Sequence, residues 1–342
     1  MKALKLLPDK TYSVIDIKDP RIKDTEILIK LGACGICGSD IGNVFSDSCK
    51  PTLNLGHEIT GTIIKVGEHF KENKFEGKRV FVNHHAPCNN CHYCFHGNET
   101  MCDKFIDSIF PCGIAEKIIV SEWIIKNNSI FELPDSMSFE EGSMIEPLAC
   151  CIRGWNKISF IKNDTVLIFG LGPIGILNAM LASTYGASQI YCVDINQNRL
   201  NFCNNLKLGV CIDGNRLNLN KIIYDNKEIQ PDLIIIATSD MEVIKKSIDI
   251  IRKGGTILIF GEPQKDTKVN IDINKIYLKE ITIKTTYAAT NKEIHKAIDL
   301  IETKEIDVSK IITHRYSIKK SKDALENAYL RDKVIKAMIT NK

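Results

Sequence analysis

Apolar positions in the middle of the chain follow the pattern of a parallel α/β sheet. A run of four, 166–169, leads into glycines, and a helical apolar stretch follows to about residue 185. A second apolar run, 189–193, ends on an aspartate, and further runs lie at 233–237 and 256–260 with helical segments between them. Continuous apolar runs that alternate with helices are typical of a doubly wound parallel sheet. The sequence therefore predicts an α/β domain over 154–290.

The chain on either side of this segment has a different pattern. Short β-type pieces punctuated by Gly, Pro and Asn lie at 27–31, 61–66, 79–82 and 116–120, as in a small barrel or sandwich. A helical pattern begins near Ser138, with Glu141 as the second half of a capping box. The residues after 290 carry helical patterns at 292–303 and 320–330 around a segment at 311–316. They are too few for an independent domain, so we expect 1–153 and 291–342 to form one β-rich domain.

Composition and charge exclude several classes of protein. The 342 residues, 44% hydrophobic and 25% charged, fit about two domains with ordinary cores. A net charge of +3 argues against a nucleic-acid partner, and the longest apolar run, 166–182, is broken by glycines and a proline and does not predict a membrane span. The N-terminus lacks the apolar core of a secretory signal. Thirteen cysteines without such a signal predict a cytoplasmic chain, in which clustered cysteines more often bind metal than form disulfides.

The glycines between the first apolar run and its helix form a dinucleotide fingerprint. One glycine permits the tight turn, the next lets the backbone approach a pyrophosphate, and the third lets helix and strand pack closely. The acid that ends the next strand accepts hydrogen bonds from an adenosine ribose and repels a 2′-phosphate, which predicts NAD over NADP. The basic residue one helical turn later is expected to flank the adenine. The predicted cofactor-binding residues are Gly170, Gly172, Pro173, Ile174, Gly175, Asp194 and Arg199.

Four cysteines with short spacings predict a structural zinc site. They are Cys88, Cys91, Cys94 and Cys102, on a segment rich in Asn and Gly. Four thiolates complete a tetrahedral zinc shell and leave no open position for a substrate. The histidines near this segment, at 84, 85, 92 and 96, are mostly expected to be surface residues of the loop.

A more dispersed set of donors suggests a second metal site. It comprises Cys37, the pair His57 and Glu58, and Glu146. A thiolate, an imidazole and a carboxylate suit a catalytic zinc that keeps a position open for water or substrate. Spacing alone leaves the alternative open that the acids lie at the surface and that the histidine belongs to a turn.

Together these motifs resemble the zinc-containing medium-chain dehydrogenase/reductase, or alcohol dehydrogenase, family. GHEITGTIIKVG at 56–67, CGSD, the four-cysteine loop, EPLA and GLGPIG occur in the family's order over essentially the whole chain. The chain is most similar to the sorbitol, galactitol-1-phosphate and threonine dehydrogenase branch, to which Glu146-Pro147-Leu148 points. The resemblance implies a GroES-like catalytic domain, a Rossmann NAD-binding domain, two zinc ions per chain, and a homodimer or homotetramer.

The resemblance also implies roles for single residues. Zinc would be held by Cys37, His57 and a glutamate, Glu58 or Glu146, directly or through water, and the hydroxyl of Ser39 would touch the substrate oxygen. Members of the branch often have a proton-relay histidine three residues after that serine, where this chain has glycine. The relay must then take another route.

We therefore expect an NAD-dependent zinc dehydrogenase that oxidises a secondary alcohol, such as a polyol, a sugar alcohol or its phosphate. One alternative is an amino-alcohol dehydrogenase of the threonine type, because His85 falls near a histidine of that subgroup. Two others come from different classes, a zinc-ribbon nucleic-acid binder and a non-catalytic zinc- or nucleotide-binding regulator. Two zinc ions per chain would indicate the enzyme, and one would indicate either non-enzyme.

Overall fold

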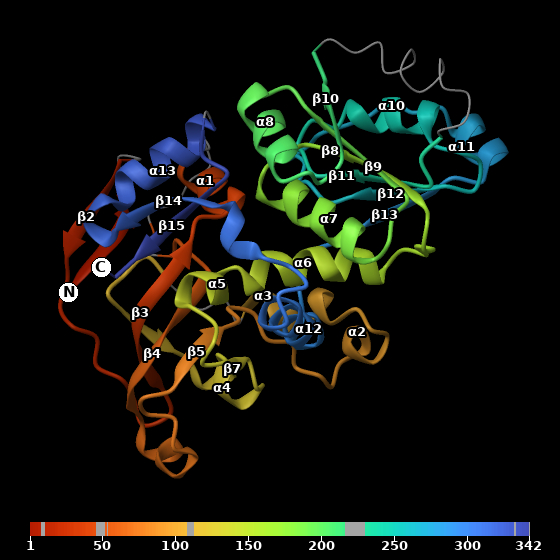
Figure 1. Ribbon diagram of the computed structural model, residues 1–342. Coiled ribbons are helices and arrows are strands. Elements are labelled where there is room, and N and C mark those ends of the chain that lie inside the picture. The colour runs from red at the N-terminus through yellow and green to blue at the C-terminus, as the bar shows by residue number, and fades with distance from the viewer. Residues whose placement is uncertain are drawn as a thin grey trace. The chain divides into compact units, whose positions relative to one another are not determined.

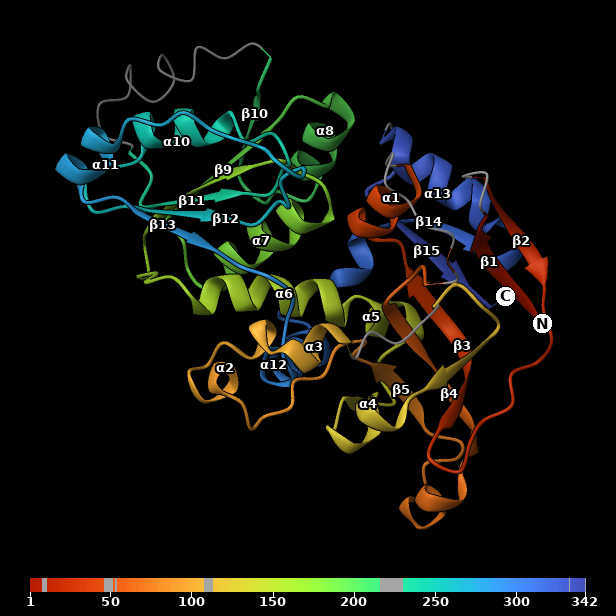
Figure 2. The same ribbon diagram turned by 180° about the vertical axis from the view of Figure 1, so that it is seen from behind.

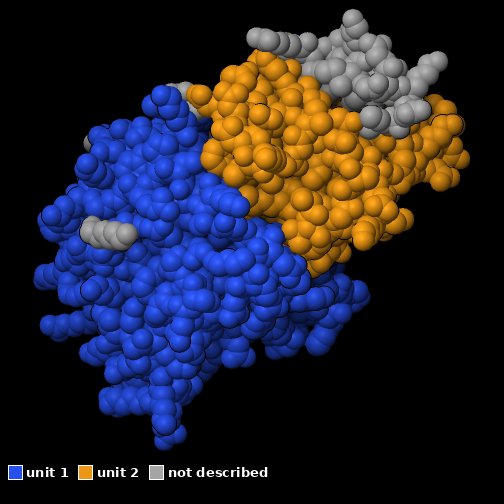
Figure 3. Space-filling view, viewed as in Figure 1, with its two compact units in different colours: residues 1–149, 289–342 blue, residues 150–288 orange. Residues whose placement is uncertain are grey.

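The computed structural model describes residues 1–7, 11–45, 52, 54–107, 113–215, 230–331 and 333–341. The chain divides into two compact units (Figure 3). Unit 1 comprises Met1–Ala149 and Ala289–Lys342, and unit 2 comprises Cys150–Ala288. Within the described residues, no helix is both long enough and apolar enough to cross a bilayer.

Unit 1 is built on a seven-stranded sheet. The strand order is β14-β15-β3-β4-β5-β7, β6 pairs with β3, and β1 and β2 form a separate hairpin (Figure 1). Neighbours in the sheet are antiparallel except β14 and β15. The strands are β1 (Lys2–Leu6), β2 (Tyr12–Asp16), β3 (Ile27–Gly35), β4 (Glu58–Val66), β5 (Arg79–Val82), β6 (Lys117–Val120), β7 (Ile130–Glu132), β14 (Ile312–Ser317) and β15 (Lys336–Thr340).

Short helices connect these strands. The α-helices are α1 (Gly38–Phe45), α2 (His92–Phe95), α3 (Asp103–Asp107), α4 (Glu122–Lys126), α5 (Phe139–Ser143), α12 (Asn291–Glu302) and α13 (Ser321–Leu330), and α6 (Ile145–Asn156) begins in unit 1 and ends in unit 2. The 3₁₀ turns are η1 (Glu68–Asn73), η2 (Glu99–Met101), η3 (Val308–Ile311) and η4 (Ile318–Lys320). The predicted capping box is present, with Ser138 as N-cap and Glu141 bonded back to it. The helical pattern that it begins is divided at Met144, between α5 and α6.

Unit 2 confirms the predicted parallel sheet. Six strands run in the order β10-β9-β8-β11-β12-β13, and every pair is parallel. Helix α7 lies on one face of the sheet and α10 on the other (Figures 1 and 2). The strands are β8 (Thr165–Phe169), β9 (Gln189–Asp194), β10 (Val210–Asp213), β11 (Leu233–Ile236), β12 (Thr256–Ile259) and β13 (Thr282–Thr285), and the helices are α7 (Pro173–Thr184), α8 (Gln197–Asn205), α10 (Val243–Ile250) and α11 (Ile273–Lys279).

Strand β15 is absent from the sequence prediction, and it matters for the site. All five of its residues are buried, and it pairs antiparallel with β3 and parallel with β14. Its first residue, Lys336, is 2% exposed. From the sequence alone, a lysine at the start of a five-residue segment is expected to be exposed to solvent, because lysine is almost never fully buried without a partner.

Candidate functional site

The four-cysteine segment has the geometry that a closed zinc site needs. The sulfurs of Cys88, Cys91, Cys94 and Cys102 all lie within 4.8 Å of one another. Cys91 and Cys94 are 3.5 Å apart at their sulfurs, as are Cys88 and Cys102. Zinc–sulfur bonds of about 2.3 Å place tetrahedral sulfurs about 3.8 Å apart, so the set fits zinc with little adjustment. A backbone hydrogen bond from Cys94 helps to lower the pKa of Cys91 to about 7, which favours its thiolate form.

A second cluster of possible metal ligands lies where the ends of three neighbouring strands of the unit 1 sheet meet. Cys37 follows the end of β3, His57 precedes β4, and His84 follows the end of β5. Because β3, β4 and β5 are antiparallel neighbours, the end of β3, the start of β4 and the end of β5 meet at the same edge. Glu58 begins β4, and Glu146 reaches the cluster from the first turn of α6.

The donor atoms of this cluster fall into two sets that share one histidine. Cys37, His57 and Glu58 form one set, and His57, His84 and Glu146 form the other, with the donor atoms of each set within 4.8 Å of one another. The predicted residues are thus brought together, but the two glutamates belong to different sets. Thiolate, imidazole and carboxylate donors fit zinc.

A buried aspartate, Asp40, which is not among the site residues predicted from sequence, orients the shared histidine. Asp40 is 2% exposed, and its carboxylate lies 3.6 Å from Nδ1 of His57. The backbone N–H groups of Cys37 and Gly56 donate to it at 3.0 and 2.8 Å. Burial would raise the pKa of Asp40, but His57 and these bonds outweigh it and lower that pKa. A carboxylate on one ring nitrogen fixes the tautomer and leaves the other nitrogen for a metal.

Glu58 forms an ion pair inside the protein. Its carboxylate is 0% exposed and lies 2.6 and 2.5 Å from Nζ of Lys336, which also donates to the carbonyl of Ile36 at 3.0 Å. Gly35 makes room for the pair, because a Cβ atom at that position would lie 1.8 Å from the Glu58 carboxylate. Burial raises the pKa of Glu58 and Lys336 opposes that rise, whereas Glu58 outweighs burial at Lys336 and raises the pKa of the lysine. The contact of one ammonium group with both carboxylate oxygens at 2.5 and 2.6 Å is that of an ion pair.

Two of the four nearby histidines are not surface residues, which corrects the expectation from sequence. His84 and His85 are 8% and 6% exposed, whereas His92 and His96 are exposed. The ring of His84 lies 4.6 Å from that of His57 and 3.9 Å from that of His85, centroid to centroid. Burial, together with these neighbouring rings, holds the pKa of His84 well below its usual value. The register of β5 against β4 turns His84 toward the cluster, and no local sequence signal reports that register.

The first turns of α1 contain Ser39, the predicted hydroxyl, and Gly42, the position at which the proton-relay histidine is missing. Ser39 is exposed two residues after Cys37. Gly42 is also exposed, and a Cβ atom there would meet nothing within 4 Å. The helix therefore has room at this position for a side chain, and the chain places none there.

The glycine turn in unit 2 has the predicted form. Gly170 has φ +90°, a conformation that side-chain-bearing residues rarely adopt, and a Cβ on Gly175 would lie 1.8 Å from the carbonyl oxygen of Gly170. Gly172 is the N-cap of α7, with Pro173 in its first turn and Ile174 next to it. The backbone N–H groups at this helix start are suited to bind a pyrophosphate.

Asp194 ends β9 beside this turn. Its carboxylate accepts hydrogen bonds from the backbone N–H groups of Leu171 at 2.6 Å and Asn196 at 2.8 Å. Arg199, one helical turn later, forms an ion pair with this acid, because its guanidinium lies 3.7 Å from the Asp194 carboxylate. The acid therefore already has a cationic neighbour, which weakens its repulsion of a 2′-phosphate relative to the expectation from sequence.

Comparisons with known proteins identify two dehydrogenase domains and the same overall chain fold. The family model of the alcohol dehydrogenase GroES-like domain matches residues 23–134, and that of the zinc-binding dehydrogenase matches 173–303. A sorbitol dehydrogenase of Bombyx mori is 29% identical over 328 residues, which cover 90% of each chain. A protein of E. coli CFT073 described as a short chain alcohol dehydrogenase, in complex with NADH, has the same fold, with a TM-score of 0.90, 24% identity and 99% of each chain covered. A protein of Sinorhizobium meliloti 1021 described as a zinc-binding dehydrogenase, bound to NADP, gives a TM-score of 0.88 at 25% identity, with 99% of this chain and 98% of that chain covered.

Proposed function

This chain belongs to the zinc-containing medium-chain dehydrogenase family, and we propose that it transfers hydride between a secondary alcohol and NAD. The observation that supports the proposal is the convergence of Cys37 and His57 with two carboxylates at one edge of the unit 1 sheet. A non-catalytic zinc or nucleotide binder has no need of this cluster in addition to the four-cysteine site.

In the proposed reaction, Cys37, His57 and a glutamate, Glu58 or Glu146, would hold the catalytic zinc. The metal would supply Lewis acidity, which makes the substrate hydroxyl a stronger acid. Asp40 keeps His57 in the tautomer and orientation that binding requires. Ser39, exposed on α1, accepts the proton of the substrate hydroxyl and passes it to solvent water, because position 42 supplies no imidazole.

The unit 2 turn binds the dinucleotide in this proposal. The start of α7, with Gly172, Pro173 and Ile174, holds the pyrophosphate through backbone N–H groups. Asp194 accepts hydrogen bonds from the adenosine ribose, and Arg199 lies beside it at the adenosine end.

We propose a polyol, a sugar alcohol or its phosphate as the substrate class. The relative from Bombyx mori is named a sorbitol dehydrogenase, and it covers most of this chain. The test is NADH formation with polyols, sugar phosphates, amino alcohols and simple secondary alcohols at equal concentration. Turnover of amino alcohols alone would support the threonine type instead, and no turnover by protein that holds two zinc ions would contradict the enzyme.

Glu146 provides a sharper test of the site. If Glu146 holds the metal or its water, Glu146→Gln should lower kcat by roughly 10²-fold or more, while NAD affinity measured by fluorescence stays unchanged. Glu140→Gln is the matched control, since Glu140 lies on neighbouring α5 and pairs with Arg315 at 2.7 Å outside both donor sets. Normal turnover of Glu146→Gln at full zinc content would remove Glu146 from the site.

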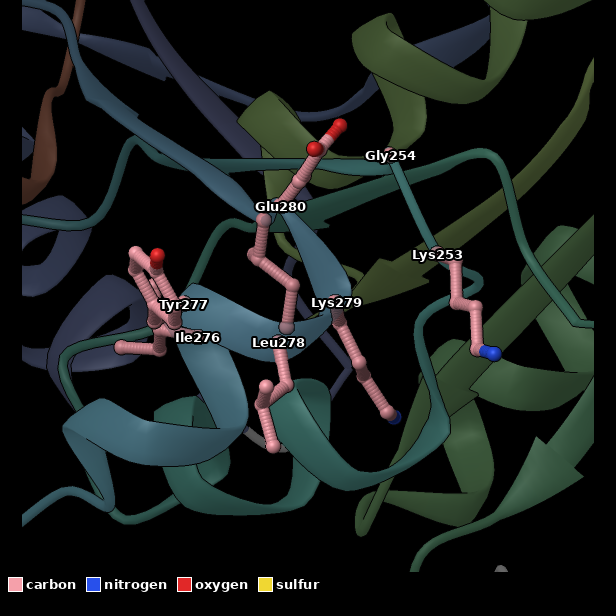
Figure 4. A pocket seen from close by; sticks show the side chains of 8 residues that line it. Lys253, Gly254, Ile276, Tyr277, Leu278, Lys279 and Glu280 are labelled. Atoms are coloured by element: carbon pink, nitrogen blue, oxygen red, sulfur yellow. The ribbon is translucent and has the colours of Figure 1, made fainter.

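We further propose that the protein is a cytoplasmic homodimer or homotetramer that associates through unit 2. β13 is the edge strand of its sheet, and neighbouring α11 exposes Ile273, Tyr277 and Leu278 at 64%, 78% and 67%. Tyr277 and Leu278 also border an open hollow with Lys253 and Lys279 (Figure 4). An exposed edge strand with apolar neighbours favours pairing with a second copy about a two-fold axis. Light scattering of wild type and Tyr277→Asp tests this, and an unchanged mass for the variant would contradict it.

A further inference from the structure

A buried amide in unit 2 has no role in the proposed reaction. The residues of α7 from Gly175 to Ala182 are all buried, and Asn178 is the one polar side chain in this run. It is 0% exposed. A polar side chain in an apolar interior costs free energy that an apolar residue at the same position would not cost. The presence of Asn178 therefore calls for specific partners.

The partners of Asn178 lie on two helices. Nε1 of Trp155 donates a hydrogen bond to Oδ1 of Asn178 at 2.9 Å. Nδ2 of Asn178 donates to the carbonyl oxygen of Ile174 at 2.9 Å and to the sulfur of Cys151 at 3.4 Å. Because an indole can only donate and a carbonyl can only accept, the amide has a single orientation that satisfies both. The network joins the last turns of α6 to the first turn of α7 within unit 2.

Ile174 belongs to the turn that is proposed to bind the pyrophosphate. The N-cap of α7 is Gly172, which has no side chain to bond the first N–H groups of the helix and so leaves them for a ligand. The helix start therefore lacks the side-chain bond that usually fixes it. Its carbonyl at Ile174 is held from inside the protein instead, by Asn178 and by the thiol of Cys151 at 3.9 Å.

The indole that holds the other end of the amide is itself fixed. Trp155 is 5% exposed, and its ring packs edge-on against Phe160 and Tyr185, with ring centroids 5.0 and 5.2 Å apart. A side chain whose rotamer is locked by packing can hold a binding group in its productive geometry. Trp155 is thus a rigid anchor to which the amide ties the turn.

We propose that Asn178 is a positioning residue for the dinucleotide. It ties the carbonyl of Ile174 to the buried indole of Trp155, so that the N–H groups at the start of α7 stay directed at the pyrophosphate. The inference rests on the proposed function and adds a residue to its cofactor site. Because Asn178 acts on the turn alone, its loss should weaken ligands that carry a pyrophosphate and spare adenosine.

Three variants of the full-length protein separate this role from a purely structural one. Asn178→Leu keeps the side-chain volume and removes the whole network. Asn178→Ser loses the anchor to the indole but keeps a hydroxyl that can donate to the carbonyl four residues earlier. Ser247→Ala is the matched control, because Ser247 is 0% exposed and its hydroxyl donates at 2.7 Å to the carbonyl of Val243, four residues earlier on α10.

The assay measures NADH affinity by fluorescence, and the affinities of ADP-ribose and adenosine by displacement of NADH. Asn178→Leu should bind NADH and ADP-ribose roughly tenfold more weakly and adenosine as wild type does. Its KM for NAD should rise by a similar factor while kcat at saturating NAD stays unchanged, which is the pattern of lost binding rather than lost catalysis. Asn178→Ser should show a smaller loss, and Ser247→Ala none.

Wild-type affinities in Asn178→Leu would overturn the inference and leave the proposed function intact. So would an equal loss for adenosine, the same loss in Ser247→Ala, or a loss in Asn178→Ser as large as in Asn178→Leu, because each would mean that the turn is not held through this amide. Wild-type protein that binds no NADH would overturn both the inference and the proposed function.

Discussion

The ion pair between Lys336 and Glu58 gives the most demanding test of this structure. Lys336→Met keeps most of the side-chain volume and removes only the ammonium group. The carboxylate that remains is 0% exposed and has lost a partner at 2.5–2.6 Å. Removing one member of a buried pair typically costs about 3–5 kcal/mol, because a buried charge is left uncompensated. That is a large part of the 5–15 kcal/mol by which a typical protein is stable.

A double variant separates the charge from the packing. Lys336→Met with Glu58→Gln removes both charges, so it should recover most of the stability that the single variant loses. The loss in Lys336→Met should also shrink as the pH is lowered, because a protonated Glu58 needs no counter-ion. At alkaline pH, wild type should lose stability as the pH rises. Because the pKa of Lys336 is raised in the folded state, the lysine's contribution to the free energy of unfolding is complete below its unfolded pKa near 10.5. That contribution is lost as the pH rises through the folded pKa.

Denaturation must be followed in unit 1 alone, because the two units can unfold separately. The chain has two tryptophans, Trp123 in unit 1 and Trp155 in unit 2. In a Trp155→Phe background, fluorescence during urea titration therefore reports unit 1. The matched control is Lys310→Met, which breaks an exposed pair with Asp307 at 3.4 Å and should cost no more than about 1 kcal/mol. A Lys336→Met protein as stable as this control would refute the reasoning.

Three further outcomes are expected. Cys102→Ser should release the less labile zinc, measured by elemental analysis, and lower the melting temperature, because the closed four-sulfur shell contributes folding energy; full zinc retention would argue against that site. Asp194→Ser should lower kcat/KM for NAD and raise it for NADP by about tenfold, because Arg199 is then free of its acid and can meet a 2′-phosphate; an unchanged cofactor ratio would contradict it. Glu141→Gln should lose stability at neutral pH by no more than about 1 kcal/mol. Lys304 and the capping bonds outweigh burial and lower the pKa of Glu141, so the difference from wild type should disappear as acid titration passes below that pKa.

Local signals in the sequence were enough for much of this protein. The glycine turn at 170–175, the cysteine spacing at 88–102 and the capping box at Ser138 each lie within a few residues of chain. Their chemistry depends on neighbours in sequence, so no long-range contact is needed to predict them. The parallel sheet of unit 2 was predicted for the same reason, because buried central strands are continuous apolar runs.

The composition of the candidate catalytic cluster was decided only by the tertiary structure. Cys37, His57 and the two glutamates were selected by residue type and resemblance, but His84 belonged to a group of four histidines mostly expected at the surface, and Lys336 was not considered. Both enter the cluster through the register of an antiparallel sheet, which places the end of β5 and the start of β15 beside the start of β4 and the end of β3. The pairing brings Lys336 to a glutamate 278 positions earlier and His84 to the nearer His57, and the sequence around each of these residues does not indicate its partner. A histidine or lysine is therefore predicted from its own neighbourhood as solvent-exposed, whereas its burial and its partner follow from the fold.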